Sequence, residues 1–595
     1  MNQMTSEMRD GMRIDRDVPI GMDDGVILRA DVFRPVAEGR YPVILSYGPY
    51  GKGLAFQEGN RKAWDHLTAA HPEFLAGSTN KYQNWELVDP EKWLPEGYAV
   101  VRVDSRGAGR SPGFIDPWSP RETQDLYQCV EWAGVQPWSS GRVGLNGISY
   151  YAMNAWQVAC LEPPHLTAIC VWEGSGDYYR EGTHHGGIFS QFFGELLPRA
   201  IIRVQHGLGE RGFRNPVTGD TVSGPETLPD EVLARNRIDI DAWIGAHPLD
   251  DEAHRARTPD WEKVQVPFLS AANWGGQGLH TRGNFEGFVN AASREKWLEA
   301  HGGTHWESFY TSYGEGLQKR FFGHFLKGEN TGWERQPRVR LQIRHPDRFV
   351  ERHENEWPLA RTQWTRFYLD PAHFTLGRNP SKASAKIAYE ALGDGLVFLL
   401  PPQQEDVEIT GPVAAKLFVS SSTTDADLFL TLRVLTPELR EIAFQGSTDP
   451  RTPVGLGWLR ASHRKLDPKR SLPHRPYHSH DQVQPLEPGV PVELDLEIWP
   501  TCIVVPKGHR IGLSIRGKDY CYPGPPIQIP GTKHVMSGVW PFVHDDPMDR
   551  PREIFGGVNT LHFDPAQQPY LLLPIIPPRT DFVRSIATSR EEEIS

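Results

Sequence analysis

Cysteine is scarce in this sequence: only five thiols are scattered over 595 residues, and no two of them form a Cys-x-x-Cys pair. A disulfide-stapled domain needs a dense cysteine framework, and a structural zinc site needs closely spaced ligands. Neither pattern is present in the sequence. We therefore expect reduced thiols, no metal and no cofactor.

Long apolar runs and an excess of positive charge are also missing. The first ten residues lack the apolar segment of a signal peptide, and no uninterrupted apolar run reaches the length of a membrane span. The net charge of −12 is spread along the chain, whereas a nucleic-acid partner requires a basic face. We expect a cytoplasmic protein with neither a membrane nor a nucleic-acid partner. The sequence leaves the oligomeric state open, a homo-oligomer included.

The motif with the clearest chemical meaning is Gly147-Ile-Ser149-Tyr150. A short β-branched segment, Arg142–Leu145, precedes it, and a proline-free, helix-compatible stretch follows it as far as Leu161. A strand, a sharp turn and a helix in that order lift one serine hydroxyl above a sheet edge, where a base can activate it. The motif predicts a nucleophilic serine at position 149. The alternative is a serine that only caps a buried helix.

Two other Gly-x-Ser triplets lack this context. Gly109-Arg-Ser111 runs directly into a proline, and Gly512-Leu-Ser514 lies inside the strand-like segment Arg510–Ile515. Proline does not fit an ordinary helix interior, and a strand cannot provide the turn that exposes the serine. We interpret neither as a nucleophile.

The chain is longer than one hydrophobic core usually supports, so two or three domains are expected. Asp24-Gly25 between two strand-like segments predicts a hairpin. Short apolar runs then alternate with helix-compatible stretches, which is typical of a parallel sheet covered on both faces. These runs are Tyr41–Ser46, Ala99–Asp104, Arg142–Leu145, Leu166–Trp172, Phe268–Ala272 and Lys296–Ala300.

The pattern changes from about Pro337 onward, where alternating strands are interrupted by proline and glycine but by no long helical period. This pattern favours an all-β sandwich of the jelly-roll type. The strands are predicted at Val339–Ile343, Thr365–Leu369, Ala415–Val419, Leu428–Val434 and Val492–Ile498. The long insertion between Trp172 and Phe268 favours a helical cap over the strand ends.

At this level of detail the chain resembles the cocaine esterase-like (CocE/NonD) serine hydrolases of the X-Pro dipeptidyl-peptidase and α-amino acid ester hydrolase superfamily. The resemblance rests on the order of the hairpin, Pro49-Tyr-Gly-Lys52, Asp104–Ser111, Gly147–Tyr150, the cap, a histidine turn and the β-sandwich. It implies an α/β fold with an α/β-hydrolase domain, a helical cap and a C-terminal jelly roll. The predicted parts are 1–175 (hydrolase, first part), 176–262 (cap), 263–332 (hydrolase, second part) and 333–595 (jelly roll).

The base and the oxyanion donors follow from the chain order of this fold and from the resemblance. A serine nucleophile needs a base, and the histidine comes from the loop after the last core strand. This loop carries His305, with His301 as its rival. The backbone N–H of Tyr150 is one expected oxyanion donor. The resemblance implies that the hydroxyl of Tyr50 is the second, with Tyr47 as the alternative.

The triad acid departs from the family pattern. The resemblance places it after the strand that follows the cap, but Ala271–Gly278 contains no carboxylate. A histidine base needs an acceptor on Nδ1 to hold its tautomer. Glu173 stands at the end of the preceding strand, and we predict it as the replacement. Asp177 is the alternative acid, whereas Glu286 is expected in a helix and turned away. In a structural role, Glu173 would instead pair with an arginine, Arg106 or Arg180.

Other signals are weaker. Three tryptophans near predicted strand ends, Trp172, Trp274 and Trp306, suggest an aromatic substrate pocket, although core packing explains them equally well. The histidine pairs His184-His185 and His478-Ser-His480 lack accompanying carboxylate or cysteine ligands, so we expect no metal there.

The sequence therefore predicts a serine hydrolase that cleaves a small carboxylic ester or amide through an acyl-enzyme, as an esterase or acylase. One alternative is an X-Pro dipeptidyl-peptidase or an amino-ester hydrolase or acyltransferase, which would need an acidic cluster for a substrate ammonium. Asp177 with Glu181 is only a hint of such a cluster. Another alternative is a catalytically decayed scaffold that now serves as a binding module.

Overall fold

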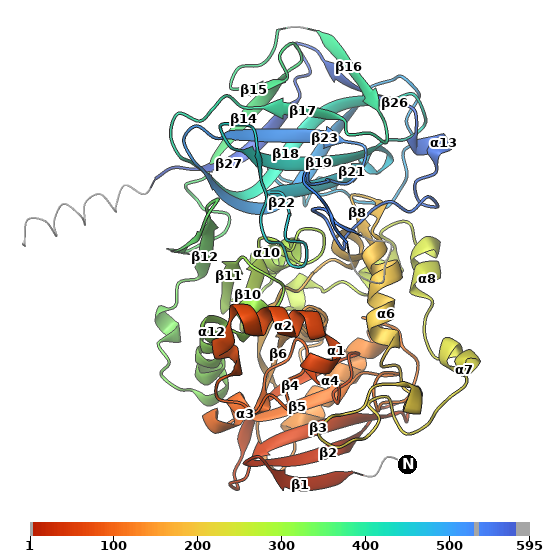
Figure 1. The fold of residues 1–595 in the computed structure, drawn as a ribbon, viewed down its shortest axis with the longest axis vertical. Coiled ribbons are helices and arrows are strands. Elements are labelled where there is room, and N and C mark those ends of the chain that lie inside the picture. Colours follow the sequence, from red (N-terminus) through yellow and green to blue (C-terminus); the bar gives the residue numbers. More distant parts are fainter. Residues whose placement is uncertain (1–3, 383, 529–534, 579–595) are drawn as a thin grey trace, which may run out of the picture.

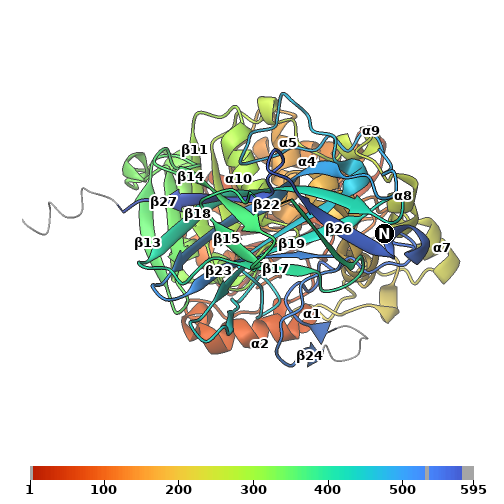
Figure 2. The same ribbon diagram turned by 90° about the horizontal axis from the view of Figure 1, so that it is seen from above.

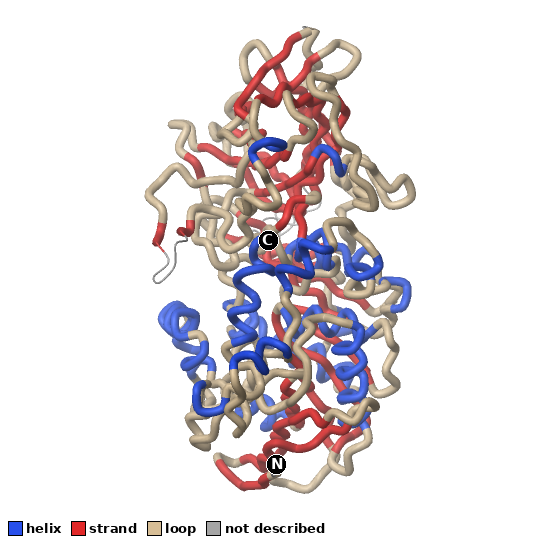
Figure 3. Tube along the Cα trace, turned by 90° about the vertical axis from the view of Figure 1, so that its right-hand side faces the viewer, coloured by secondary structure: helices blue, strands red, loops and turns tan. Residues whose placement is uncertain are grey.

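Two large β-sheets carry most of the chain, one in each half of the molecule (Figure 1). The computed structural model describes residues 4–382, 384–528 and 535–578. Figure 3 shows most of the helices gathered in the half that contains the N-terminus, whereas the other half consists mainly of strands and loops. The strands of the first sheet extend to Glu354, so the division lies beyond the change of pattern that the sequence shows near Pro337.

The first sheet has eleven strands in the order β1-β2-β3-β5-β4-β6-β7-β10-β11-β12-β13. All neighbours from β5 to β12 pair in parallel, whereas the strands at both ends pair antiparallel. The strands are β1 (Thr5–Arg9), β2 (Met12–Gly21), β3 (Ile27–Pro35), β4 (Tyr41–Gly48), β5 (Ala99–Asp104), β6 (Ser139–Ile148), β7 (Leu166–Trp172), β10 (Phe268–Asn273), β11 (Lys296–His301), β12 (Val339–Arg344) and β13 (Phe349–Glu354).

Helices cover both faces of this sheet, as a parallel sheet requires. One apolar core lies between the sheet and α4, α5 and α10, and another lies between the opposite face and α1, α2, α3, α11 and α12. The helices are α1 (Phe56–Gly59), α2 (Arg61–Ala70), η1 (Pro72–Leu75), α3 (Pro90–Trp93), η2 (Leu94–Glu96), α4 (Pro120–Gly134), α5 (Tyr150–Ala159), α10 (Thr281–Asn290), α11 (Glu307–Tyr310), α12 (Ser312–Phe322), η7 (Gly323–Lys327) and η8 (Trp333–Arg335).

The insertion between β7 and β10 is a cap of short helices and one small hairpin, β8 with β9. Figure 1 shows α6, α7 and α8 along one side of the first sheet. Its elements are η3 (Tyr178–Thr183), β8 (His184–His185), β9 (Ile188–Phe189), η4 (Phe192–Leu196), α6 (Leu197–Ile202), η5 (Gly209–Arg211), α7 (Asp230–Arg235), α8 (Ile240–Ala246), α9 (Glu252–Arg255) and η6 (Trp261–Lys263).

The second sheet is a twelve-stranded sandwich that packs its strands around a separate apolar core, and Figure 2 shows its strands crossing above the first sheet. Its strands are β14 (Gln363–Asp370), β15 (Thr375–Gly377), β16 (Ala385–Glu390), β17 (Leu396–Leu399), β18 (Val407–Ser421), β19 (Asp427–Leu435), β20 (Glu441–Ile442), β21 (Gly455–Arg460), β22 (Val492–Val505), β23 (Arg510–Arg516), β26 (Val558–Phe563) and β27 (Tyr570–Ile576). A small hairpin, β24 (Ile527–Gln528) with β25 (Val535–Met536), and the helices η9 (Ala461–His463) and α13 (Arg552–Phe555) complete this part.

The predicted α/β-hydrolase fold with a cap and a C-terminal β-sandwich is confirmed, with one strand reassigned. We expected Val339–Ile343 in the sandwich, but β12 pairs in parallel with β11 and extends the first sheet. Its alternate residues Val339, Leu341 and Ile343 are buried in the core of that sheet. Alternation of this kind cannot distinguish an outer strand of one sheet from the first strand of the next.

A buried ion-pair cluster holds the loop after β4. The Nζ of Lys52 lies 2.8 Å from Oδ1 of Asp17 and 2.7 Å from Oδ1 of Asp31, on strands β2 and β3. The backbone N–H of Lys52 also donates to Asp104 at the end of β5. Because Tyr50 is two residues away, this cluster fixes the position of its loop above the sheet edge.

We expect Lys52→Met to lower the free energy of unfolding by about 3 kcal/mol, because it leaves two buried carboxylates with weaker compensation. The matched control is Lys81→Met, which removes an exposed pair with Asp10 and should cost less than about 1 kcal/mol. Urea unfolding of both variants measures the difference. Equal midpoints for the two variants would show that the cluster contributes no more than a surface pair.

Candidate functional site

Ser149 stands on a sharp turn between β6 and α5, as the motif predicts. Its backbone angles are φ 58° and ψ −109°, a combination that is uncommon for a residue with a side chain. The turn also needs glycine at position 147, because a Cβ there would lie 2.5 Å from Cβ of Tyr151 and 3.2 Å from the carbonyl oxygen of Glu86. The local sequence thus creates the exposed, strained serine of a nucleophile elbow.

Ser149 faces a cavity of about 180 Å³. The walls are mainly aromatic and aliphatic, and polar groups gather near the serine. The apolar wall includes Trp85, Phe192, Leu196, Leu279, Trp306 and Phe542, and the polar groups include Tyr50, Glu86, His280 and His305. An apolar cavity with a few convergent polar groups is the usual form of a small-molecule site.

The structure brings the predicted base and the predicted acid together. Nδ1 of His305 lies 2.7 Å from Oε2 of Glu173, and both side chains are buried. Glu173 also accepts hydrogen bonds from Asn273 Nδ2 at 3.2 Å and Ser447 Oγ at 3.3 Å, and its Oε1 lies 3.4 Å from Nε2 of His301. Burial alone would raise the pKa of this carboxyl group, but the adjacent histidines lower it to about 2. Glu173 is therefore ionised at neutral pH.

The arginine pairing that would have given Glu173 a purely structural role is not found. Arg106 pairs with Asp24 and Asp125, and Arg180 pairs with Asp177 and Asp250. The partners of Glu173 are histidines, an amide and a hydroxyl.

The nearest base to Ser149 is a histidine that the sequence analysis missed. Oγ of Ser149 lies 3.1 Å from Nε2 of His280, just before α10, and no hydrogen bond joins Ser149 to His305 among the described residues. The rings of His280 and His305 stack with centroids 5.0 Å apart and an angle of 5° between their planes. Little in the sequence indicates His280, because it lies beyond the segment Ala271–Gly278 where the family acid is expected and no motif marks it.

A second residue that the sequence analysis missed is Glu86, whose Oε1 lies 3.2 Å from Nε2 of His305. Burial raises the pKa of Glu86. Burial disfavours the imidazolium of His305, but the negative charge of Glu173 and hydrogen bonds to both carboxylates raise its pKa to about 10. Both shifts favour a proton held between His305 and Glu86. No sequence motif marks Glu86, which lies in a loop before α3 with φ 64°.

The two expected oxyanion donors lie at the site. Tyr50 lines the cavity, and its ring packs edge-on against Tyr150 and Tyr151. The N–H of Tyr150 is the first amide of α5 and has no partner within the helix. The alternative donor, Tyr47, is buried in the core beneath α4, and it does not line the cavity.

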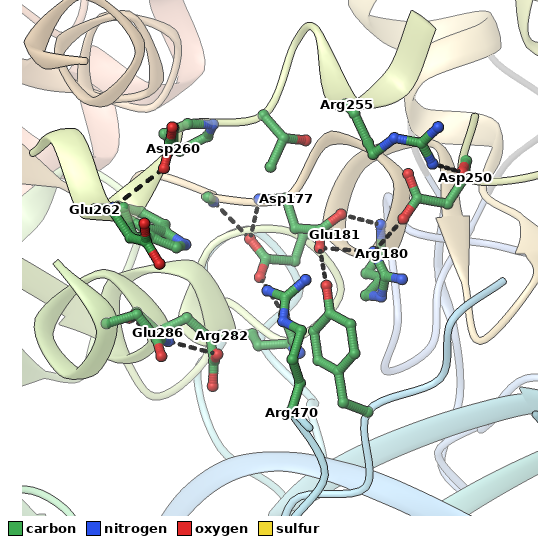
Figure 4. A pocket seen from close by; sticks show the side chains of 16 residues that line it. Asp177, Arg180, Glu181, Asp250, Arg255, Asp260, Glu262, Arg282, Glu286 and Arg470 are labelled. Carbon is green, nitrogen blue, oxygen red and sulfur yellow. Dashed lines mark hydrogen bonds and ion pairs between the residues drawn. The ribbon is translucent and has the colours of Figure 1, made fainter. Parts of the chain in front are cut away.

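The alternative acids are engaged elsewhere. Asp177 pairs with Arg180, and Glu286 on α10 lies 3.0 Å from Nη1 of Arg475. Asp177 and Glu181 both line a separate charged cleft of about 500 Å³, where Arg282 pairs with Glu181 (Figure 4). Asp177 and Glu181, the possible ammonium-binding pair, are compensated by arginines and do not line the cavity of Ser149.

Of the three tryptophans predicted to form an aromatic pocket, Trp306 lines the cavity. Trp172 is buried in the core against Phe309, and Trp274 is buried in a stack with Phe285. Both follow strand ends, but their rings turn into the cores on the two faces of the sheet. A position at a strand end does not fix the direction of a side chain.

The β-sandwich half completes the site. Besides its bond to Glu173, Ser447 accepts the backbone N–H of His305 and donates its own to Gly275. Thr448 and Phe542, from the same half, line the cavity. Figure 1 shows α10 at the boundary between the two sheets. The active-site geometry thus depends on how the two halves pack together.

Within the described residues, no group of three or more histidine, cysteine, aspartate or glutamate side chains could hold a metal ion. The same part of the chain has no helix long and apolar enough to cross a membrane. His184, His185, His478 and His480 are instead buried where the cap meets the second sheet, where His185 bonds to His544 at 2.7 Å.

Comparisons with known proteins agree with this geometry. The profile of the X-Pro dipeptidyl-peptidase (S15) family matches residues 24–307, and that of the X-Pro dipeptidyl-peptidase C-terminal non-catalytic domain matches 331–572. Cocaine esterase from a Rhodococcus species is 24% identical over 94% of this chain and 98% of its own length.

Solved structures show the same relationship. A CocE/NonD family hydrolase from Staphylococcus aureus is 30% identical, covers 95% of this chain and 94% of its own, and superposes with a TM-score of 0.81. An α-amino acid ester hydrolase at 16% identity and a TM-score of 0.61, covering 95% of this chain and 97% of its own, shares the fold. With its serine elbow and its buried histidine–carboxylate pair, the chain is a serine hydrolase and belongs to the CocE/NonD family.

Proposed function

We propose that this hydrolase cleaves small carboxylic esters or amides, with Ser149 as nucleophile, His305 as base and Glu173 as the acid that orients the base. The 2.7 Å contact between His305 and Glu173 is the observation that carries this assignment. It fixes the hydrogen of the imidazole on Nδ1 and leaves Nε2 to accept the proton of Ser149. The elbow geometry of Ser149 and the small apolar cavity support the same assignment.

The reaction follows from these positions. Ser149 Oγ attacks the substrate carbonyl and gives its proton to His305, which then protonates the leaving group. The N–H of Tyr150 and the hydroxyl of Tyr50 are the proposed donors to the oxyanion. Water hydrolyses the acyl-enzyme by the same steps, again with His305 as base.

His280 is a second candidate base, because its Nε2 is 3.1 Å from Ser149. Its Nδ1 is buried and has no hydrogen-bond partner among the described residues, so no acid can orient it. A buried N–H without an acceptor is costly, which favours the tautomer with hydrogen on Nε2. Burial and the neighbouring His305 hold the pKa of His280 well below its usual value, so the ring stays neutral. We therefore propose that His280 donates to Ser149 Oγ and leaves the serine proton to His305.

Glu86 then defines a resting state. Its carboxyl group occupies Nε2 of His305, the atom that must accept the serine proton. For the reaction, Nε2 has to exchange Glu86 for Ser149 Oγ. The buried pair of Glu173 and His305 and the strained turn at Ser149 argue against the decayed binding module. The match to the X-Pro dipeptidyl-peptidase family supports the X-Pro alternative at the level of the family. Within the site, Asp177 and Glu181 are paired with arginines and leave no free acidic cluster for a substrate ammonium.

The domain boundaries given above, the cytoplasmic location and the oligomeric state stay predictions.

We expect a fluorophosphonate to label native protein at Ser149 and to leave Ser149→Ala unmodified. Glu173→Gln should lower the turnover of p-nitrophenyl esters by roughly 10² to 10⁴, because the imidazole loses its acceptor. Asp177→Asn and Glu286→Gln are matched carboxylate controls and should retain activity. Full activity of Glu173→Gln would contradict the acid assignment.

The same esterase assay distinguishes the roles of His305 and His280. His305→Ala should lose roughly 10⁴ in turnover, whereas His280→Ala should lose only about tenfold, the value of one hydrogen bond. If His280→Ala is as damaged as Ser149→Ala while His305→Ala stays active, His280 is the base.

We expect kcat/KM of the native enzyme to rise with pH toward about 10, because His305 must be deprotonated to act as a base and its pKa is raised to about 10. In Glu86→Gln one neighbouring negative charge is lost, so the pKa of His305 falls. The acidic limb of the profile should then move to lower pH by about 1 to 3 units.

The control for this profile is Glu286→Gln, which removes a carboxylate outside the cavity and should leave the limb in place. A limb that stays fixed in Glu86→Gln, or that moves to higher pH, would show that Glu86 does not hold His305 in the resting state.

A further inference from the structure

Among the described residues that line the catalytic cavity there is one arginine, Arg203, whose guanidinium has no role in the proposed reaction. Arg203 follows α6 of the cap and lines the same cavity as Ser149. Its Nη1 donates to the carbonyl of Gly59 at 2.7 Å, and its Nη2 donates to Oδ1 of Asn60 at 3.3 Å. Both acceptors are neutral, so the hydrogen bonds position the group without compensating its charge.

No carboxylate pairs with Arg203 within the part of the chain that the structure describes. Its Nε is buried and makes no hydrogen bond there. Burial lowers the pKa of the guanidinium, and among the described residues Tyr50 is the ionisable group that opposes this shift. Arg203 is thus a partly buried cation whose desolvation is not offset by a counter-ion.

Other buried arginines show how unusual this position is. Arg180 and Arg282 each pair with two carboxylates. Among the described residues, Arg102 and Arg344 also have no acidic partner, but each is held in a core by three protein acceptors, and neither lines the catalytic cavity. Arg203 therefore combines an uncompensated charge with access to the space that the substrate occupies.

We infer that Arg203 binds a free carboxylate of the substrate, and that the preferred substrates are esters or amides that also carry this anion, such as half-esters of dicarboxylic acids. A guanidinium matches a carboxylate in shape and charge, and the contact is strengthened in an apolar cavity. The inference rests on the proposed function, because it names the substrate class of the same site.

The charges also orient such a substrate. Glu86 contacts Nε2 of His305, and Glu86, Arg203 and Tyr50 all line the cavity of Ser149. The charge of Glu86 raises the pKa of the Tyr50 hydroxyl, whereas the charge of Arg203 lowers it. A substrate carboxylate is repelled by Glu86 and attracted by Arg203. In this orientation, the ester carbonyl of the substrate points toward Ser149. The small cavity volume of about 180 Å³ favours a short chain between the two groups.

The test compares phenyl hydrogen succinate with phenyl 4-oxopentanoate, in which a neutral methyl ketone replaces the carboxylate. A second pair, 4-acetoxybenzoate and phenyl acetate, places the anion on the leaving group. Relative to native enzyme, Arg203→Gln should have a kcat/KM about 10- to 100-fold lower on one of the two anionic substrates. On the neutral partner of that substrate, the loss should be less than about threefold. The affected pair identifies the side of the ester that Arg203 contacts.

Arg203→Lys keeps the charge and should retain more of the anionic activity than Arg203→Gln. The matched control is Arg199→Gln, because Arg199 is an exposed arginine on α6 that does not line the cavity. This variant should show the same preference between anionic and neutral esters as native enzyme. High salt should reduce the native preference for the anionic ester.

Equal losses on anionic and neutral substrates, or no loss on either, would overturn the inference while leaving the hydrolase assignment intact. Native enzyme that is labelled at Ser149 but prefers both neutral esters would overturn it as well. Failure of the proposed function looks different, because native enzyme would then hydrolyse no ester and Ser149 would resist the fluorophosphonate.

Discussion

The catalytic half of this molecule depends on one buried contact, the carboxylate of Glu173 against Nδ1 of His305. An isolated carboxylate at this depth would take up a proton, because burial disfavours its charge. The charge persists because an amide, a hydroxyl and two histidines surround it. These groups come from β10, from β11 and the loop after it, and from the β-sandwich half. The acid is consequently a property of how the two halves pack, and not of one loop.

In the proposed assignment, the same contact replaces the acid that the family pattern places after β10. In parallel sheets, the carboxyl ends of neighbouring strands meet at one edge, so a carboxylate at the end of β7 lies beside the position after β10. Asn273 occupies that position here and donates to Glu173 instead of replacing it. Moving the acid by one strand keeps the direction from which it approaches the imidazole, which is what the chemistry requires.

The ionisable groups around the serine differ in the direction in which their pKa values are shifted. The adjacent histidines lower the pKa of Glu173, burial lowers the pKa of His280, and Glu173 and Glu86 raise the pKa of His305 in spite of its burial. On the cap side of the cavity, Arg203 keeps its charge without a counter-ion. Placing groups of opposite pKa tendency within a few ångströms is how a hydrolase separates the roles of orienting acid, base and substrate anchor.

The sequence by itself determined the elements that local patterns encode. Turn chemistry and short apolar runs depend on neighbours in the chain, so the sequence alone could locate the features that they encode. These are the serine elbow, the succession of strands along the chain, the loop with His305 and the carboxylate at the end of β7. Tertiary structure alone decided which distant segments meet. It brought His280 to Ser149 and Glu86 to His305, turned two of the three tryptophans into the core, and joined β12 to the first sheet. No periodicity records such contacts, since they arise from the packing of a cap, a sheet edge and a second domain around one cavity.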